Sequence, residues 1–484
     1  MFVTSSGART RAGKTELVRK RWAKTGEVRG TADYDDLLAA LMARRFEKRQ
    51  GLHVPFHGGK SADPIYADWF ALDQTELDGL DDWAAPAGLI HQAQVRVAAH
   101  YHLDDACLLT AGSSQGVATA ILAAVEEGGL LLSHQGAHRS LLHGLLLTGA
   151  KLRLVADAWD SRWQVSWPDV AALCEAVGRL RPQAVVVTSP TYAGLAPDLG
   201  ALRLVCARVG TVLIVDAAHG SHFGLGPLPP LATDLRPDLV VLGVHKSGGA
   251  PTAGAILGRI GDRISNHRWQ AARRAVGSSS PSYPLMAAIE RAVIRLGTSG
   301  GKEMSSLAAV MSTLGGPAVF QPPPGIAYDP TRVVVASTSS SRQELSALGV
   351  DPEYVAPRHL LLIGTLSTQS LSPDLVTWVA AQPAPGAALA SPTLARRRRE
   401  VRAAFLAASE VVALQHSVGR ILTVPLVPSP PGIPLAWPGQ VIDRQLQAQV
   451  RSAIAAGQEV LGLDAGKVTV VRGSAPAGEE HRHG

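Results

Sequence analysis

The sequence predicts an α/β fold with a mainly parallel sheet, followed by a smaller α+β C-terminal domain. Three observations predict it: short apolar runs recur between residues 108 and 246, helical patterns separate several of them, and a Pro/Gly-rich break lies near residues 300–326. Continuous apolar runs are typical of parallel strands that helices cover on both faces. Ligands of such sheets bind at the carboxyl ends of the strands, so the residues directly after each run are candidate functional residues.

The first expected element is a helix over residues 35–50, where apolar residues recur at helical spacing as far as Gly51. The expected strands that follow lie within the strand-like runs 108–110, 129–134, 150–156, 183–190, 211–220 and 238–246. Helical patterns over 117–127 and 169–180 stand between them. These elements and their connections make up a predicted large domain over residues 33–315.

The predicted C-terminal domain covers residues 326–484. Residues 332–337 and 359–366 are apolar runs of strand length, and 381–392 has the Pro/Ala-rich composition of a loop or linker. Residues 394–412 carry a helical pattern, so we expect the run Arg396–Arg399 to be a solvated helix face rather than an anion site.

The charge of the chain is unevenly distributed. Its 484 residues carry a formal charge of +6, with 46 Lys and Arg against 40 Asp and Glu. Residues 1–30 hold eight of these basic residues and only Glu16 and Glu27, which is also a net +6, so the rest of the chain is neutral. We therefore interpret residues 1–32 as a basic flexible arm, and we expect no nucleic-acid partner for the body of the protein.

Cysteine content and hydropathy indicate the compartment. Three cysteines without C-x-x-C spacing cannot build a disulfide framework, and no apolar run reaches the roughly 18 residues of a membrane span. We expect a cytoplasmic protein with no membrane partner. His53 and His57 stand four residues apart, but a loop before a Gly-Gly turn is a better interpretation than a metal site.

Two neighbouring strand ends carry the residues of one particular chemistry. The strand 211–215 ends in Asp216, with His219 three residues later, and the strand 238–244 is followed by His245 and Lys246. An enzyme that uses pyridoxal phosphate needs a lysine that forms a Schiff base with the cofactor and a carboxylate that keeps the pyridine nitrogen protonated. Lys246 and Asp216 are the candidates for these two roles.

The same cofactor needs a cradle for its phosphate group. The turn Gly112-Ser113-Ser114 leads from a strand into the helical stretch 117–127 and supplies backbone N–H groups, two hydroxyls and a helix N-terminus. Most Gly/Ser turns are merely helix caps, but this one occurs together with the lysine and the carboxylate in the expected order.

Several further segments resemble the Orn/Lys/Arg decarboxylase family of fold-type-I pyridoxal phosphate enzymes, in a short form without the N-terminal wing domain. The resemblance runs from about residue 50 to residue 470. The segments that carry it are HVPFHGGK (53–60), DQTELDGLDDW (73–83), TAGSSQG (110–116), HQGAHRSLLHGLLLTGA (134–150), TSPTYAG (188–194), DAAHGSHF (216–223), HK (245–246) and PSPPGIPLAWPGQ (428–440).

The resemblance implies a role for each matching position. It implies that His138 stacks on the cofactor ring and that His219 and His245 join Lys246 and Asp216 around the cofactor. In the mechanism that we expect, Ser113, Ser114 and His245 anchor the phosphate, and Lys246 or a neighbouring histidine returns a proton. The substrate-binding positions that it implies are Gln440, His57 and Glu76. It also implies a homodimer or higher oligomer with the active site between subunits.

Four departures from the family pattern indicate a divergent substrate site. Gly243 replaces a hydroxyl residue, which removes one phosphate contact; Ala217 and Ser429 replace a Glu and a Tyr. Gln440 replaces the Glu of P-G-E, which in relatives helps to bind the distal cation of the substrate. A hydrogen bond to a charged group contributes about 1.5–3 kcal/mol against about 0.5–1.5 for a neutral one, so we expect this change to weaken recognition of a substrate cation by roughly tenfold.

The resulting hypothesis is a pyridoxal phosphate-dependent lyase that decarboxylates a basic or related amino acid through a Schiff base on Lys246. Two alternatives stay open at this point. One is another pyridoxal phosphate reaction on an amino acid, such as oxidation, elimination or transamination in a specialised pathway. The other, which the presence of Lys246, Asp216 and His138 argues against, is a non-catalytic subunit with the same fold.

Overall fold

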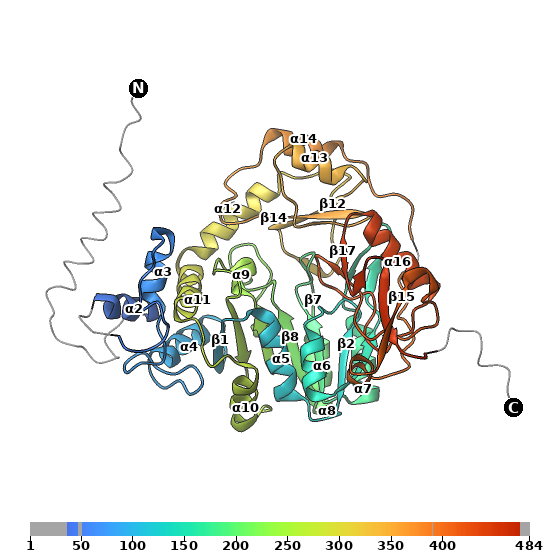
Figure 1. Ribbon diagram of the computed structural model, residues 1–484. Coiled ribbons are helices and arrows are strands. Elements are labelled where there is room, and N and C mark those ends of the chain that lie inside the picture. Colours follow the sequence, from blue (N-terminus) through green and yellow to red (C-terminus); the bar gives the residue numbers. More distant parts are fainter. Residues whose placement is uncertain (1–35, 47–50, 390, 475–484) are drawn as a thin grey trace.

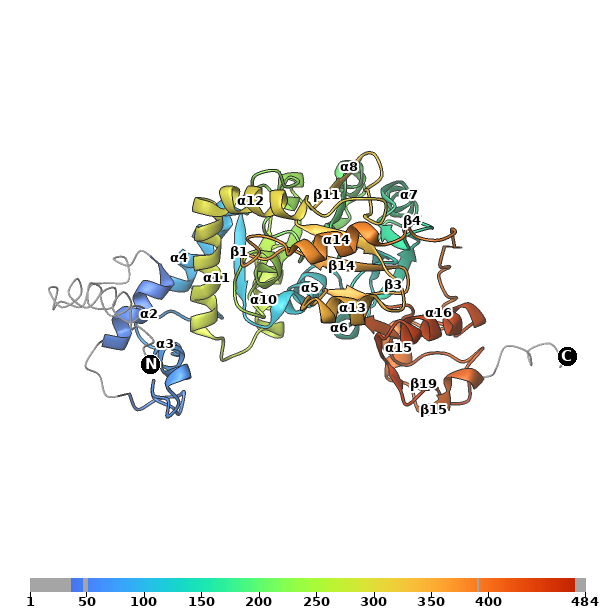
Figure 2. The same ribbon diagram turned by 90° about the horizontal axis from the view of Figure 1, so that it is seen from above.

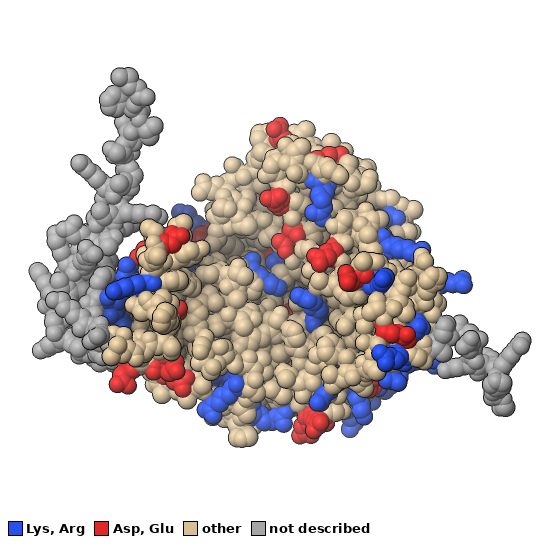
Figure 3. All heavy atoms as spheres, viewed as in Figure 1, with Lys and Arg blue, Asp and Glu red and all other residues tan. Residues whose placement is uncertain are grey.

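The computed structural model describes residues 36–46, 51–389 and 391–474 (Figure 1). The arm predicted over residues 1–32 lies outside this part of the chain. The expected first helix is present as α2 (Leu37–Phe46). Figure 3 shows Lys and Arg side chains interspersed with Asp and Glu over the visible face.

A seven-stranded sheet forms the centre of the large domain, with the strand order β1-β10-β9-β8-β6-β2-β3. In that order the strands are β1 (Asp105–Leu109), β10 (Ala255–Arg259), β9 (Leu239–Leu242), β8 (Val212–Ala217), β6 (Ala184–Thr188), β2 (Leu130–His134) and β3 (Lys151–Val155). Only β10 runs antiparallel to its neighbours; all other pairings in the sheet are parallel. The mainly parallel sheet is therefore confirmed.

Helices cover the sheet on both faces, which is why its strands are apolar almost throughout. Figures 1 and 2 show α5 and α6 on one face and α7 and α8 on the other. The helices of this domain are α4 (Leu89–His100), α5 (Gly112–Ala124), α6 (Leu141–Thr148), α7 (Val170–Leu180), α8 (Gly200–Val209), α10 (Asn266–Val276) and α11 (Tyr283–Arg295). Helix α5 can lie close to the sheet because residue 116 is a glycine. A Cβ at this position would lie only 2.9 Å from the side chains of Leu109 in β1 and Val241 in β9.

The C-terminal part contains two further small α+β layers with their own hydrophobic clusters. The first consists of α12 (Gly301–Met311), β12 (Arg332–Ala336), α13 (Ser341–Ala347), β13 (Tyr354–Val355), β14 (His359–Ile363) and α14 (Pro373–Ala381). The second consists of β15 (Ser409–Ala413), β16 (Val427–Ser429), α16 (Arg444–Ala455), β17 (Glu459–Leu461), β18 (Leu463–Asp464) and β19 (Lys467–Val471). The strands expected at 332–337 and 359–366 are thus present.

The exact domain division stays a prediction. Met304, Leu307 and Met311 of α12 pack into the cluster of the first C-terminal layer, although α12 falls within the predicted large domain. In addition, β11 (Ile326–Tyr328) pairs with β7 (Leu195–Pro197), which ties the two parts together.

The helix expected over residues 394–412 is wrong for most of its length. Only α15 (Val401–Phe405) is helical, and residues 409–413 form strand β15. The backbone of the arginine run pairs with residues 439–441 instead: Arg398 N donates to Gly439 O over 2.8 Å and Val441 N donates to Arg396 O over 2.8 Å. Tertiary pairing here overrides the helix propensity of the Ala, Arg and Glu residues.

Candidate active site

Lys246 and His219 meet at the carboxyl ends of two neighbouring strands. Lys246 lies in the short helix α9 (Val244–Ser247), directly after β9, and His219 follows the end of β8. The Lys246 Nζ atom is 3.0 Å from His219 Nε2. Lys246 lines a cavity of about 350 Å³ between the sheet and the first C-terminal layer, and Figure 3 shows the molecule hollowed below that layer.

The buried Arg332, at the start of β12, determines which nitrogen of His219 carries the proton. Arg332 Nη2 lies 3.1 Å from His219 Nδ1. A guanidinium can only donate, so Nδ1 accepts, and the neutral imidazole therefore carries its proton on Nε2. The Nε2–H group then donates to Lys246 Nζ, which can accept only as a neutral amine.

The electrostatics favour the same protonation states. Burial, together with the charges of Lys246 and Arg332, holds the pKa of His219 well below its usual range. Burial also lowers the pKa of Lys246; Arg332 lowers it further, and Asp216 partly opposes both effects. A neutral lysine beside a neutral histidine is the state that a nucleophilic amine requires.

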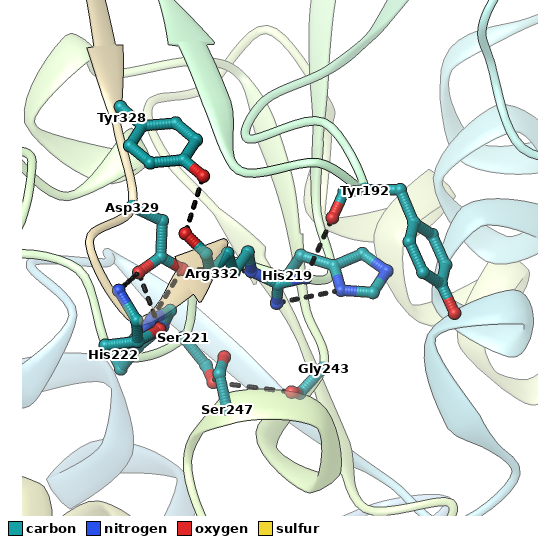
Figure 4. A network of polar contacts seen from close by, with 10 residues as sticks. Tyr192, His219, Ser221, His222, Gly243, Ser247, Tyr328, Asp329 and Arg332 are labelled. Atoms are coloured by element: carbon teal, nitrogen blue, oxygen red, sulfur yellow. Dashed lines mark hydrogen bonds and ion pairs between the residues drawn. The ribbon is translucent and has the colours of Figure 1, made fainter. Parts of the chain in front are cut away.

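A buried polar network fixes Arg332 itself (Figure 4). Its Nε donates to Asp329 Oδ2 over 3.0 Å and its Nη1 donates to Tyr192 O over 2.9 Å. His222 Nε2 lies 2.9 Å from the same Asp329 oxygen, and Tyr192 places its ring against His219 with centroids 4.4 Å apart. All three nitrogens of the guanidinium thus have partners. We call Tyr192, His219, His222, Asp329 and Arg332 the Arg332 network.

Asp216 is buried at the end of β8 with little to balance its charge. Its side chain accepts one hydrogen bond, from Ala218 N over 3.2 Å, and no ion pair to it occurs within the described residues. Burial raises its pKa, and Lys246 in its protonated form would oppose this. A buried carboxylate without an ion-pair partner is the group that a protonated pyridine nitrogen would satisfy.

His138 lies at the junction of the large domain and the second C-terminal layer. A Cβ on Gly432 would be 2.8 Å from His138 Nε2, and Arg139 N donates to Gly432 O over 3.0 Å. Burial, reinforced by the charges of Lys246 and Arg139, lowers the pKa of His138 to about 3. A neutral imidazole is the form that can lie flat against an aromatic ring without a net charge.

The predicted phosphate turn is linked to the lysine turn by hydrogen bonds. Gly112 N donates to Ala253 O over 2.8 Å, and His245 N donates to Gly254 O over 3.0 Å. Both turns therefore form hydrogen bonds to neighbouring residues of one loop. Helix α5 begins at Gly112, which has a positive φ of 81°, and no side chain caps its N-terminus. Its first N–H groups, with the Ser113 and Ser114 hydroxyls nearby in the chain, are suited to an anion.

His245 differs from the expected phosphate ligand in one respect. Its Nδ1 lies 2.9 Å from Gly254 O, so this nitrogen donates its proton to the carbonyl. Burial lowers the pKa of His245, and the bond to Gly254 partly offsets this. A neutral His245 in this tautomer presents Nε2 as an acceptor, so it would have to be protonated to bind a phosphate oxygen.

These residues fit pyridoxal phosphate. Burial lowers the pKa of Lys246, the Asp216 carboxylate forms no ion pair within the described residues, and no side chain caps the N-terminus of α5. A further buried group, Thr188 Oγ1, has no hydrogen-bond partner within the described residues, and Thr188 pairs with Asp216 in the sheet. An unsatisfied buried hydroxyl beside the carboxylate is consistent with an additional ligand there.

Three residues assigned to substrate binding do not line the Lys246 cavity. Gln440 is buried in the second C-terminal layer, where Oε1 accepts from Trp437 N and Nε2 donates to Ala395 O, both over 2.7 Å. His57 lies 3.2 Å from Asp73 and stacks on Phe70, away from the sheet. Glu76 is exposed beside Thr75. Their roles stay predictions.

The departure at Gly243 has a steric reason. A Cβ at this position would lie 2.5 Å from Ala218 O and 3.3 Å from the Lys246 side chain. Any hydroxyl residue would therefore push on the strand end that holds His219. The departure at Ala217 is likewise in the core, because this residue is fully buried in β8.

Sequence reasoning missed Arg332 and Asp329, which complete the site. Both lie in the stretch IAYDPTRVVVAS, where a charged residue opens an apolar strand. A buried strand that begins with Asp-Pro-Thr-Arg was the available signal, since Asp and Arg are almost never fully buried unless paired.

Within the described residues, the fold contains no helix long and apolar enough to cross a membrane. It also contains no group of three or more His, Cys, Asp or Glu side chains that could hold a metal ion.

Comparison with known proteins places this geometry in a family context. The bacterial arginine decarboxylase of Bacillus subtilis (strain 168) is 25% identical over 470 residues, covering 87% of this chain and 94% of that enzyme. The arginine decarboxylase of Halalkalibacterium halodurans is 26% identical over 478 residues, covering 88% of this chain and 94% of that enzyme.

Solved structures show the same fold at lower identity. The lysine decarboxylase LdcF of Francisella novicida has a TM-score of 0.77 at 14% identity, covering 96% of this chain and 84% of that one. The constitutive lysine decarboxylase of E. coli has a TM-score of 0.71 at 16% identity, with coverages of 90% and 82%. This confirms a fold-type-I large domain with a smaller C-terminal part.

The family models agree with both parts of the chain. The major domain of Orn/Lys/Arg decarboxylase matches residues 61–311, just over half of the sequence, and the C-terminal domain of the same family matches residues 387–463. The chain therefore belongs to the Orn/Lys/Arg decarboxylase family of pyridoxal phosphate-dependent carboxy-lyases.

Proposed function

We propose that the protein decarboxylates a basic or related amino acid, with Lys246 as the residue that carries pyridoxal phosphate. The observation that carries the proposal is the 3.0 Å contact between Lys246 Nζ and His219 Nε2, in which the lysine must accept. When bound, the cofactor supplies an electron sink for the pair released as the bond between Cα and the carboxylate breaks.

The residues of the chain bind, orient and move protons around that chemistry. Asp216 provides the carboxylate for the pyridine nitrogen, and His138 provides a neutral ring against the cofactor face. Arg332 holds His219 so that its Nε2–H group points at Lys246. Lys246 Nζ and His219 Nε2 are then the two atoms from which a proton can return to Cα after carbon dioxide leaves.

Recognition of the substrate's distal group points to a second subunit. The residues that line the Lys246 cavity include Arg332, His222 and Met304 but no Asp or Glu. A distal cation would need a carboxylate from elsewhere, since a buried charge must be paired. Glu76, which the family pattern assigns to the substrate, is exposed on this subunit and available to a partner's site.

An exposed apolar segment supports a homodimer. Phe56 is fully exposed, Leu52 is 87% exposed and Ile65 is 82% exposed. Contiguous exposed apolar residues of this size mark interaction surfaces. We call residues 52–76, which also contain His57 and Glu76, the 52–76 segment, and propose that it packs against a second copy.

The three free cysteines are in keeping with the reducing cytoplasm.

The replacement Lys246→Ala tests the function. We expect the visible absorbance of lysine-bound pyridoxal phosphate to vanish and decarboxylation to fall by at least about 10⁴-fold. The assay incubates the enzyme under air with arginine, lysine, ornithine and other amino acids and measures carbon dioxide and amine. Lys302→Ala, an exposed lysine of α12, is the matched control and should retain both signals.

Two results would contradict the proposal. A Lys246→Ala protein with an unchanged spectrum would exclude this lysine as the cofactor-carrying residue. A keto acid or peroxide formed without carbon dioxide would show a different reaction on an amino acid.

A further inference from the structure

A second cavity lies at the outer edge of the sheet and is lined by arginines. It has a volume of about 460 Å³ and lies between β3, labelled in Figure 2, and residues 394–400. Arg153 of β3 and Arg397, Arg398 and Arg399 line it together with Glu400. None of its lining residues lines the Lys246 cavity.

The charge in this cavity is strongly positive. Glu400 is the one acidic side chain in its lining, and it forms an ion pair with Arg153 at 3.1 Å. Gln440 also lines the cavity but is neutral, and its amide is already bonded to Trp437 and Ala395. Among the described lining residues, Arg153, Arg397 and Arg399 therefore share the single carboxylate of Glu400.

Arg397 is held in place with one donor left over. Its Nη1 donates to Pro438 O over 2.8 Å, whereas its Nη2 is buried and has no hydrogen-bond partner within the described residues. Burial lowers the pKa of Arg397 to about 10, so the group remains charged at neutral pH. A buried, charged donor without an acceptor is unfavourable unless a ligand supplies one.

We propose that this cavity binds a phosphate-bearing anion with more than one negative charge. Guanidinium groups match phosphate oxygens in pairs, which favours phosphate over a simple halide. The space is larger than a single phosphate group, and Leu152, Leu154 and Leu394 give it an aliphatic wall against which an organic group can pack. The ligand is thus a phosphate ester or an inorganic polyphosphate, and it binds apart from the cofactor.

Calorimetric titration of the holoenzyme tests this site, because the cofactor's own site is then already filled. The probes are pyrophosphate and adenosine triphosphate. Binding should weaken as salt rises, as expected for contacts between charged groups. The double variant Arg153→Gln/Arg399→Gln removes two exposed arginines of the cavity and should weaken binding at least about tenfold, with decarboxylation in the absence of the probe unchanged.

Arg402→Gln is the matched control, because Arg402 lies three residues from Arg399 and does not line the cavity. It should bind both probes within about twofold of the parent protein. Tighter binding of adenosine triphosphate would identify a phosphate ester as the ligand class, and binding of pyrophosphate alone would identify an inorganic polyphosphate. Absence of binding by both probes, or equal weakening in the control and the double variant, would overturn the proposal.

Discussion

The Arg332 network and the 52–76 segment differ in how their interactions are satisfied. In the network, Arg332 and Asp329 are almost completely buried and bond to each other and to neighbours from the same chain. In the 52–76 segment, large apolar side chains such as Phe56 face solvent. A single chain therefore contains the groups that prepare Lys246, whereas the predicted substrate residues His57 and Glu76 belong to a segment whose large apolar side chains are exposed.

Removing Arg332 should have the largest effect, because the network has no substitute for it. Arg332→Met leaves Asp329 buried without its guanidinium partner, and breaking a buried pair in this way costs about 3–5 kcal/mol of folding free energy. Chemical denaturation measures the loss. The control Arg402→Met removes an exposed pair with Glu127 at 4.0 Å, which is worth at most about 1 kcal/mol. Equal losses in both variants would mean that Arg332 acts merely as a surface arginine.

The pH dependence of stability follows from the same network. Burial alone would raise the pKa of Asp329, but His222, Arg332 and Thr331 outweigh it and hold that pKa well below its usual range. Since the folded pKa is depressed, the stabilisation is present above the unfolded value of about 4 and is lost as pH falls below it. Asp329→Asn should flatten this acid dependence in denaturation experiments, and an unchanged slope would contradict it.

Self-association is the next largest expected effect. Phe56→Asp places a charge in the exposed apolar surface and should weaken dimer formation by at least about 30-fold if Phe56 is central to the interface. Sedimentation over a range of protein concentrations measures this. Leu204→Asp, which changes a 73% exposed leucine on α8, is the control and should leave association unchanged. If the Phe56→Asp protein sediments like the parent protein, the 52–76 segment is not part of the dimer interface.

The sequence predicted the parts of the site that follow strand ends. Asp216 and Lys246 lie at the ends of apolar runs, with His219 three residues after Asp216, and parallel strands bring such positions to one edge. Arg332 was not predictable in this way because it lies beyond the domain break and opens a strand, where a charged side chain is ordinarily solvated. Its role became visible only from its burial and from the three partners of its guanidinium.

Gln440 and Arg396–Arg399 show a second limit of sequence reasoning. Local composition predicted a helix through the arginine run, but pairing with residues 439–441 holds it extended. The motif match assigned Gln440 to the substrate, yet its amide is satisfied by backbone groups of its own layer. A motif fixes the order of residues along the chain, whereas which surface they face depends on contacts between distant segments.

Substrate recognition gives a smaller effect that links the two regions. Glu76→Gln should raise KM for a basic amino acid about tenfold and change kcat little, because a neutral hydrogen bond replaces a charged one. The hydrogen bond from Thr75 lowers the pKa of Glu76, so the carboxylate is charged at neutral pH. Asp68→Asn, a neighbouring exposed acid, should leave KM unchanged. An unchanged KM for Glu76→Gln would mean that another residue binds the distal cation of the substrate.

The smallest expected effect concerns residues 1–32, which belong to neither region. They carry the net positive charge of the sequence but precede the part that matches the family, which begins at residue 61. A chain that starts at residue 33 should keep its cofactor absorbance, its kcat/KM and its sedimentation behaviour within about twofold, because no group assigned to cofactor, substrate or dimer contact is removed. The full-length protein, measured at the same salt concentration, is the control. Loss of the cofactor absorbance would contradict this prediction and show that residues 1–32 are needed for the fold around Lys246. Loss of association alone would show that they contribute, with the 52–76 segment, to the dimer interface.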